Sequence, residues 1–164
     1  MYSLPIEEYY KEGEAIHNTL SNCRPKRELK DEHPDIDEVR TKLEQISEKG
    51  IEITITFKPE LQNRYSPRTL TDIVKNILRE YRKRNKFTCV MVGEFSRVGI
   101  YHLHGSILAP ARMINSMRRK LPHELGRTEL KAIRYVESWV AYCLKDEETN
   151  EEKELTEDEL IYMV

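Results

Sequence analysis

Two histidines one residue apart, His102 and His104, are the side chains of this sequence most clearly arranged for chemistry. They lie in the run GIYHLHGSIL (99–108), whose composition is typical of a β-strand. Residues i and i+2 of a strand point to the same side, so both imidazoles face one way. Such a pair also arises by coincidence on an ordinary sheet face. The two histidines alone therefore leave a metal site and a plain polar sheet face as open interpretations.

Glu94 adds a third candidate ligand, because it lies on the preceding predicted strand, eight residues before His102. If the turn between the strands has an odd number of residues, or a bulge, Glu94 lies opposite His102 on the same face. One carboxylate and two imidazoles leave coordination positions open. That set suits Mn²⁺ or Mg²⁺ that also binds a substrate oxygen. Zinc is less favoured, since no thiolate or third histidine is nearby in the sequence.

A second candidate group lies in SWVAYCLKD (138–146), where a predicted helix places Tyr142 and Lys145 three residues apart on one face. A tyrosine hydroxyl is a poor nucleophile near its ordinary pKa of about 10. A neighbouring ammonium stabilises the phenolate, and a metal ion on a phosphate makes the phosphorus more electrophilic. The chain has nine tyrosines, however, so such pairs arise easily. A packed tyrosine beside a solvated lysine is the alternative interpretation.

The elements that must position these residues follow from the hydrophobic periodicity. Predicted helices cover 6–20, 36–49, 67–84, 112–121 (ended by Pro122) and 135–145, and predicted strands cover 51–59, 87–95, 100–108 and 129–133. Antiparallel strands with helices packed on them give the α+β class. No apolar run approaches the roughly 18 residues of a membrane span, and the acidic N-terminus does not match a secretory signal.

The charge of −2 on the 164-residue chain is unevenly distributed. Residues 1–50 carry 8 Lys/Arg and 12 Asp/Glu, residues 51–140 carry 17 and 8, and residues 141–164 carry 2 and 9. A basic middle between acidic ends is a plausible footprint for a polyanion such as nucleic acid. Solvated helix faces explain the same charges equally well. Three cysteines share no metal-type spacing and indicate reduced thiols.

Together these motifs resemble the HUH endonucleases, the rolling-circle replication initiators of small circular DNA viruses and plasmids. The resemblance covers residues 51–146, about 60% of the chain. ITITF resembles the first family motif, YHLHG the His-hydrophobe-His motif, and YCLKD the Tyr-x-x-Lys-Asp motif of single-tyrosine viral initiators. Glu94 lies where those proteins place a third metal ligand. The fifty-residue N-terminal extension and the lack of a Walker A motif depart from the pattern of many viral initiators.

The resemblance implies a five-stranded antiparallel sheet with flanking helices and a metal-dependent nickase of single-stranded DNA. Glu94, His102 and His104 would hold the metal. Tyr142 would attack the phosphodiester, keep the 5′ phosphate and release a free 3′ hydroxyl, with Lys145 assisting, and the reverse reaction would rejoin strands. The basic residues expected to contact DNA are Lys58, Lys83, Arg84, Lys86, Arg97, Arg118, Arg119 and Lys120.

We therefore expect a helical acidic extension (1–50), an HUH-type nuclease domain (51–146) and an acidic tail (147–164). The expected partners are single-stranded DNA at a replication origin, including an origin in a hairpin, and host replication machinery or a helicase. We expect an intracellular protein, in the host cytoplasm or in the nucleus of a eukaryotic host, with no membrane partner. Two alternatives stay open: a non-catalytic nucleic-acid-binding protein, and a metal-dependent phosphodiesterase that uses water.

Overall fold

Five antiparallel strands form the centre of the structure, a computed structural model that describes residues 34–146 and 149–164. The strands are β1 (Ile51–Phe57), β2 (Thr88–Phe95), β3 (Tyr101–Leu108), β4 (Gly126–Ala132) and β5 (Leu160–Met163), in the sheet order β4-β1-β3-β2-β5. Helices flank this sheet, which confirms the predicted α+β class. The predicted helix at 6–20 lies outside the described residues.

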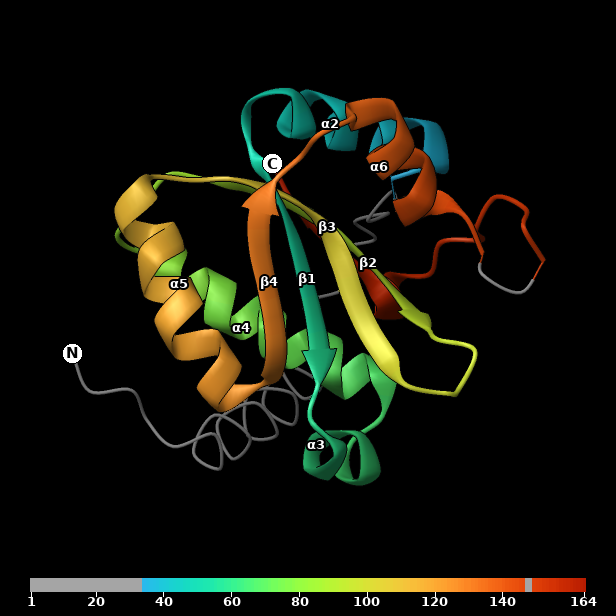
Figure 1. Ribbon diagram of the computed structural model, residues 1–164, viewed down its shortest axis with the longest axis horizontal. Helices are drawn as coiled ribbons and strands as arrows, with labels where there is room; N and C mark the ends of the chain where they lie inside the picture. Colours follow the sequence, from blue (N-terminus) through green and yellow to red (C-terminus); the bar gives the residue numbers. More distant parts are fainter. Residues whose placement is uncertain (1–33, 147–148) are drawn as a thin grey trace, which may run out of the picture. The chain divides into compact units, whose positions relative to one another are not determined.

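Helices cover both faces of the sheet (Figure 1). They are α2 (Ile36–Lys49), α3 (Pro59–Arg64), α4 (Pro67–Arg82), α5 (Ala111–Glu124), α6 (Val136–Leu144) and the 3₁₀ turn η1 (Glu157–Glu159). Helices α2 and α6 pack on each other and on β2 and β3. On the opposite face, a hydrogen bond of 3.1 Å between the hydroxyls of Tyr81 and Ser116 joins α4 to α5. The functional candidates lie on the α2 and α6 face.

Strand β1 explains how the two faces separate. Its apolar residues Ile53, Ile55 and Phe57 are buried, and they alternate with half-buried polar residues. Alternate residues of a strand point to opposite faces. Because Thr54 pairs with His104 and Thr56 with His102, the threonines share the histidine face. The apolar set packs on the other side, where burial of each large side chain contributes about 1.5–3 kcal/mol.

The β2–β3 turn determines whether Glu94 meets the histidines. Ser96 and Ile100 close the turn through a hydrogen bond of 2.8 Å, which leaves the three residues 97–99 as the loop. Gly99 has φ +78, a left-handed conformation that L side chains rarely adopt. The odd loop length pairs Phe95 with Tyr101 and therefore Glu94 with His102. The condition stated from the sequence, that the turn brings Glu94 onto the face of the two histidines, is confirmed.

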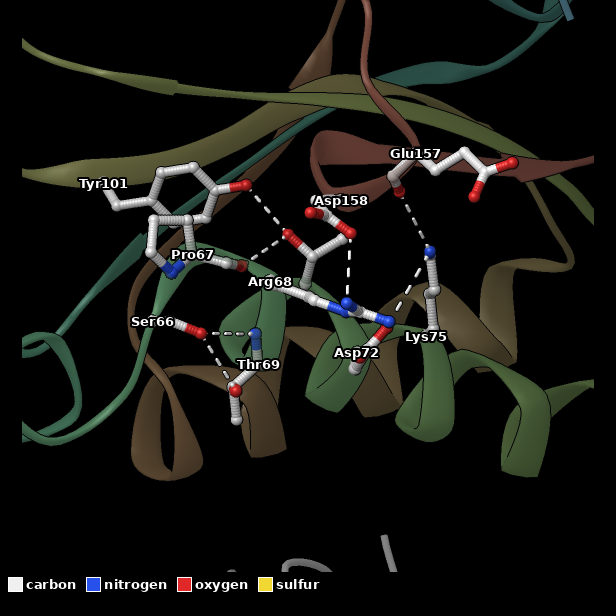
Figure 2. Close-up of polar contacts among 10 residues, drawn as sticks. Ser66, Pro67, Arg68, Thr69, Asp72, Lys75, Tyr101, Glu157 and Asp158 are labelled. Carbon is white, nitrogen blue, oxygen red and sulfur yellow. Dashed lines mark hydrogen bonds and ion pairs between the residues drawn. The ribbon is translucent and has the colours of Figure 1, made fainter. Parts of the chain in front are cut away.

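Residues assigned from the sequence to an acidic tail belong to the folded unit that spans residues 34–164. β5 pairs with β2, with Met91 opposite Ile161. Figure 2 shows η1 held against α4: Arg68 pairs with Asp158 at 3.4 Å, and the Lys75 ammonium donates to the Glu157 carbonyl at 3.4 Å. Helix α2 packs on the same sheet. Both α2 and β5 therefore belong to one folded unit with the sheet, across the boundaries expected at residues 50 and 147.

Candidate metal centre

Glu94, His102 and His104 come together on one sheet face. The Oε1 atom of Glu94 lies 3.3 Å from the Nε2 atoms of both histidines. All three side chains are buried, and His104 is fully so. The Oε1 atom of Glu94 is shielded from water and has no hydrogen-bond partner among the described residues. A buried carboxylate oxygen without a partner is costly, which marks this position as one that suits a ligand.

The spacing of these three atoms fits one metal ion. Two ligands bound about 2.1 Å from an ion and separated by 90–110° lie about 3.0–3.4 Å apart. The two Oε1–Nε2 distances of 3.3 Å fall in this interval, and all three ligand atoms lie within 4.8 Å of one another. The buried Glu94, His102 and His104 group can therefore hold a metal ion. One oxygen and two nitrogens suit a divalent cation.

Burial and neighbouring charges set the protonation states that such a site requires. Burial and, to a smaller extent, the charge of the Lys153 ammonium lower the pKa of His104 to about 3. Burial alone would raise the pKa of Glu94, but contacts with His102, His104 and Lys153 together hold it below its ordinary value. At neutral pH His104 is thus neutral and Glu94 is ionised. These are the metal-binding forms of both side chains.

Tyr142 lies next to this group, on the last turn of α6. Its ring centroid is 5.1 Å from that of His104, and its ring stacks on Trp139 at 5.7 Å. Trp139 is itself fixed, because its indole N–H donates to the Ser106 hydroxyl at 3.0 Å. Tyr142 is 48% exposed. The structure therefore brings a solvent-accessible phenol beside the buried ligands.

Lys145 is not held beside Tyr142 by a helix. Helix α6 ends at Leu144, and Lys145 has extended backbone with φ −102 and ψ 133. It forms an isolated antiparallel bridge with Glu152. The expectation that helical spacing places both residues on one face is wrong, since the chain leaves the helix one residue too early.

Lys153 is the site residue that the sequence did not indicate. Its ammonium contacts Glu94 Oε2 at 2.5 Å, His104 Nε2 at 3.3 Å and the Cys143 carbonyl at 3.0 Å. The residue is 8% exposed. One signal was available: Lys153 is the single basic residue among nine acidic ones between 146 and 159. A lone cation in so acidic a stretch suggests a specific partner.

The predicted DNA-contacting residues do not form one cluster. Lys58 follows β1 and Arg97 lies in the β2–β3 turn, so both are at the strand ends near Glu94. Lys83, Arg84 and Lys86 precede Thr88, and β2 spans about 20 Å between Thr88 and Glu94. Arg118, Arg119 and Lys120 lie on α5, where Arg118 donates twice to the Leu130 carbonyl, at 2.8 and 3.2 Å.

A polar sheet face lies beside the metal ligands and was not anticipated. The register aligns Arg127 with Thr56 and His102, and Glu129 with Thr54 and His104. Arg127 is 77% exposed at its side chain and pairs with Glu129 at 2.9 Å. Among the described elements, α2 and α6 cover mainly β2 and β3. The β1 and β4 part of this face thus offers hydroxyls and a guanidinium to solvent.

No family model, curated protein or solved structure matches this chain. Within 34–146 and 149–164, no helix combines the length and apolar character that a bilayer span needs.

Proposed function

We propose that this protein is a metal-dependent, site-specific nickase and strand transferase of single-stranded DNA. It would act through a covalent 5′-phosphotyrosine intermediate and initiate rolling-circle replication. The observation that carries the proposal is the contact between Tyr142 and His104, with ring centroids 5.1 Å apart. It joins a candidate nucleophile to a candidate metal ligand that is 38 residues away in the sequence. Motif resemblance to the HUH endonucleases supports the same assignment, including the replication role and an origin as substrate.

The three ligands would hold Mn²⁺ or Mg²⁺, which supplies electrostatic stabilisation of the phosphate oxygens. The Tyr142 oxygen attacks the phosphorus, so that a tyrosine–phosphate bond forms and the bond to the 3′ oxygen breaks. The departing 3′ oxygen takes up a proton and the phenol loses one, which balances the step. Attack by the 3′ hydroxyl on the phosphotyrosine reverses it and rejoins the strand.

The buried ligands and the exposed phenol have complementary roles in this chemistry. Sheet residues hold the ligand atoms rigidly, while Tyr142 at 48% exposure is open to a strand arriving from solvent. The polar β1 and β4 face lies directly beside the ligands. Thr54, Thr56 and Arg127 on this face offer hydrogen-bond donors for a phosphate backbone. This arrangement fits a single strand better than a rigid duplex, since bases can splay away from the sheet.

A covalent-capture experiment tests the proposal. The protein is incubated with Mn²⁺ and a random pool of single-stranded DNA carrying a label at the 3′ end, which is the part that stays attached to tyrosine. Label that migrates with denatured protein reports the intermediate, and sequencing the captured DNA gives the site. Tyr142→Phe is expected to abolish capture. Tyr135→Phe, at an exposed residue just before α6, is the matched control and is expected to retain it.

The two alternatives predict different results in the same experiment. A water-using phosphodiesterase would cleave DNA without captured label and would tolerate Tyr142→Phe. A non-catalytic binding protein would retain DNA without cleavage, whether or not metal is chelated. Capture that persists in Tyr142→Phe would place the nucleophile on another residue.

A further inference from the structure

Lys153 makes three contacts that match its three ammonium protons. The acceptors are Glu94 Oε2 at 2.5 Å, the Cys143 carbonyl at 3.0 Å and His104 Nε2 at 3.3 Å. An ammonium group only donates hydrogen bonds. The Nε2 atom of His104 must therefore present its lone pair to Lys153. This is the same lone pair that a metal ion would take.

The chain around Lys153 fixes the residue in this position. Its backbone N–H donates to the Leu144 carbonyl at 2.8 Å, directly at the end of α6. The preceding residue, Glu152, forms the bridge with Lys145 and an ion pair with Arg40 of α2. Lys153 thus enters the site from a segment that is tied to both helices of this face.

We propose that Lys153 is the internal cation of the site, which holds Glu94 and His104 in ligand positions and is displaced from His104 when a metal binds. This inference rests on the metal-binding part of the proposed function, but not on DNA cleavage. The charge of Lys153 offsets the cost of burying the Glu94 carboxylate beside a neutral histidine.

Lys153 and a metal ion share Glu94 but compete for His104. The carboxylate has two oxygens: Oε2 pairs with Lys153, while Oε1 faces both histidines. His104 Nε2 has one lone pair, which only one of the two cations can use. Their like charges also repel strongly across a buried site. Lys153 therefore stabilises the metal-free protein and weakens metal binding.

Calorimetric titration of the chelator-treated full chain with Mn²⁺ alone tests this competition. Lys153→Gln retains an amide donor but removes the charge, so it is expected to bind Mn²⁺ at least about ten-fold more tightly than the wild type. The same variant is expected to unfold at a lower temperature without metal. Lys49→Gln, which removes an exposed lysine at the end of α2, is the control and is expected to change neither quantity.

The outcomes separate this inference from the metal site itself. Equal or weaker Mn²⁺ binding by Lys153→Gln, with binding retained by the wild type, overturns the inference alone, because a merely structural lysine would not oppose the metal. Absence of binding to the wild type overturns both the metal site and the inference.

A labelling measurement on the wild type does not depend on how a variant folds. Acetylation of each lysine by a soluble acylating reagent is followed by mass spectrometry with and without Mn²⁺. Lys153 is expected to react slowly without metal and several-fold faster with it, because displacement frees the amine. Lys145 is expected to react at the same rate in both. An unchanged Lys153 rate in protein that binds Mn²⁺ contradicts displacement.

Discussion

Glu94 lies directly opposite His102 in the β2–β3 ladder, and its Oε1 atom is 3.3 Å from the histidine Nε2. A register shifted by one residue would move Glu94 to the other face of the sheet. The three-residue turn that sets the register is therefore as important to the candidate metal site as its three side chains are. Gly99, with its positive φ, is the residue on which this turn depends.

Gly99→Ala is expected to lower the free energy of unfolding by about 1 kcal/mol, as measured by urea denaturation. Apart from Gly99 and its two chain neighbours, no heavy atom of the described residues lies within 4 Å of the added methyl group, so backbone strain is the expected cost. Val98→Ala in the same turn is the control, because Val98 is 80% exposed. Equal stability of both variants would contradict the assigned turn.

Glu94→Gln is expected to weaken Mn²⁺ binding by at least about ten-fold in a calorimetric titration, because the amide removes the anionic ligand. Glu52→Gln is the matched control: Glu52 lies on β1 opposite Ser106, and its carboxylate pairs with Lys131 at 3.3 Å. Unchanged Mn²⁺ affinity in Glu94→Gln would remove this residue from the ligand set.

The stability of the metal-free protein should fall as the pH falls from about 6.5 towards 3. The pKa of His104 is about 3 in the folded protein against an ordinary 6.5, so only the unfolded chain takes up this proton in that interval. The lowered pKa of Glu94 acts in the same direction, below its ordinary value of 4.5. One proton corresponds to at most about 1.4 kcal/mol per pH unit.

Thermal unfolding across this pH range, with a chelator present, measures the slope of stability against pH. His104→Asn is expected to flatten it between pH 6.5 and 4.5. His123→Asn, at an exposed residue of α5, is expected to leave it unchanged. An identical slope in His104→Asn and the wild type would contradict a neutral buried His104.

Tyr101→Phe is expected to lower the free energy of unfolding by about 1 kcal/mol, measured by denaturant titration. Thr71 donates its single hydroxyl proton to the Pro67 carbonyl at 2.9 Å, so the buried Tyr101 hydroxyl must donate to Thr71 at 2.8 Å. Phenylalanine loses this bond and keeps the ring packing against Phe57. A loss above about 3 kcal/mol would mean that the ring itself has moved.

Arg97→Ala and Arg127→Ala are each expected to weaken binding of single-stranded DNA more than Lys83→Ala does. The two arginines lie at the ligand end of the sheet, whereas Lys83 lies at the opposite end of β2. Fluorescence anisotropy at several salt concentrations measures both the affinity and its salt dependence. A larger effect of Lys83→Ala would place the DNA at the far end.

The local elements and the grouping of Glu94, His102 and His104 on one face could be predicted from the sequence, because short-range patterns encode them. The alternation of apolar and polar residues predicted β1. The spacing of Glu94 and His102 predicted that both share a face if the turn between them has an odd number of residues. The prediction that Pro122 ends a helix is wrong, since Pro122 lies inside α5. The helix continues past it, and the Leu125 N–H donates to the Leu121 carbonyl at 2.8 Å. A proline close to a helix end interrupts few bonds.

Long-range packing accounts for what the sequence did not predict. Strand β5 is only four residues long and follows an acidic stretch, so pairing with β2 rather than local propensity determines it. Lys153 joins the site only because the chain turns back after α6 and its backbone bonds to Leu144. No periodicity within 146–159 could show that this lysine is buried beside Glu94.

Anomalous X-ray scattering from crystals soaked in Mn²⁺ shows whether Glu94, His102 and His104 hold a divalent metal beside Tyr142. We expect one strong anomalous peak about 2.0–2.3 Å from Glu94 Oε1 and from the Nε2 atoms of both histidines. Absence of a peak there at saturating Mn²⁺, or a peak held by other side chains, would contradict this expectation.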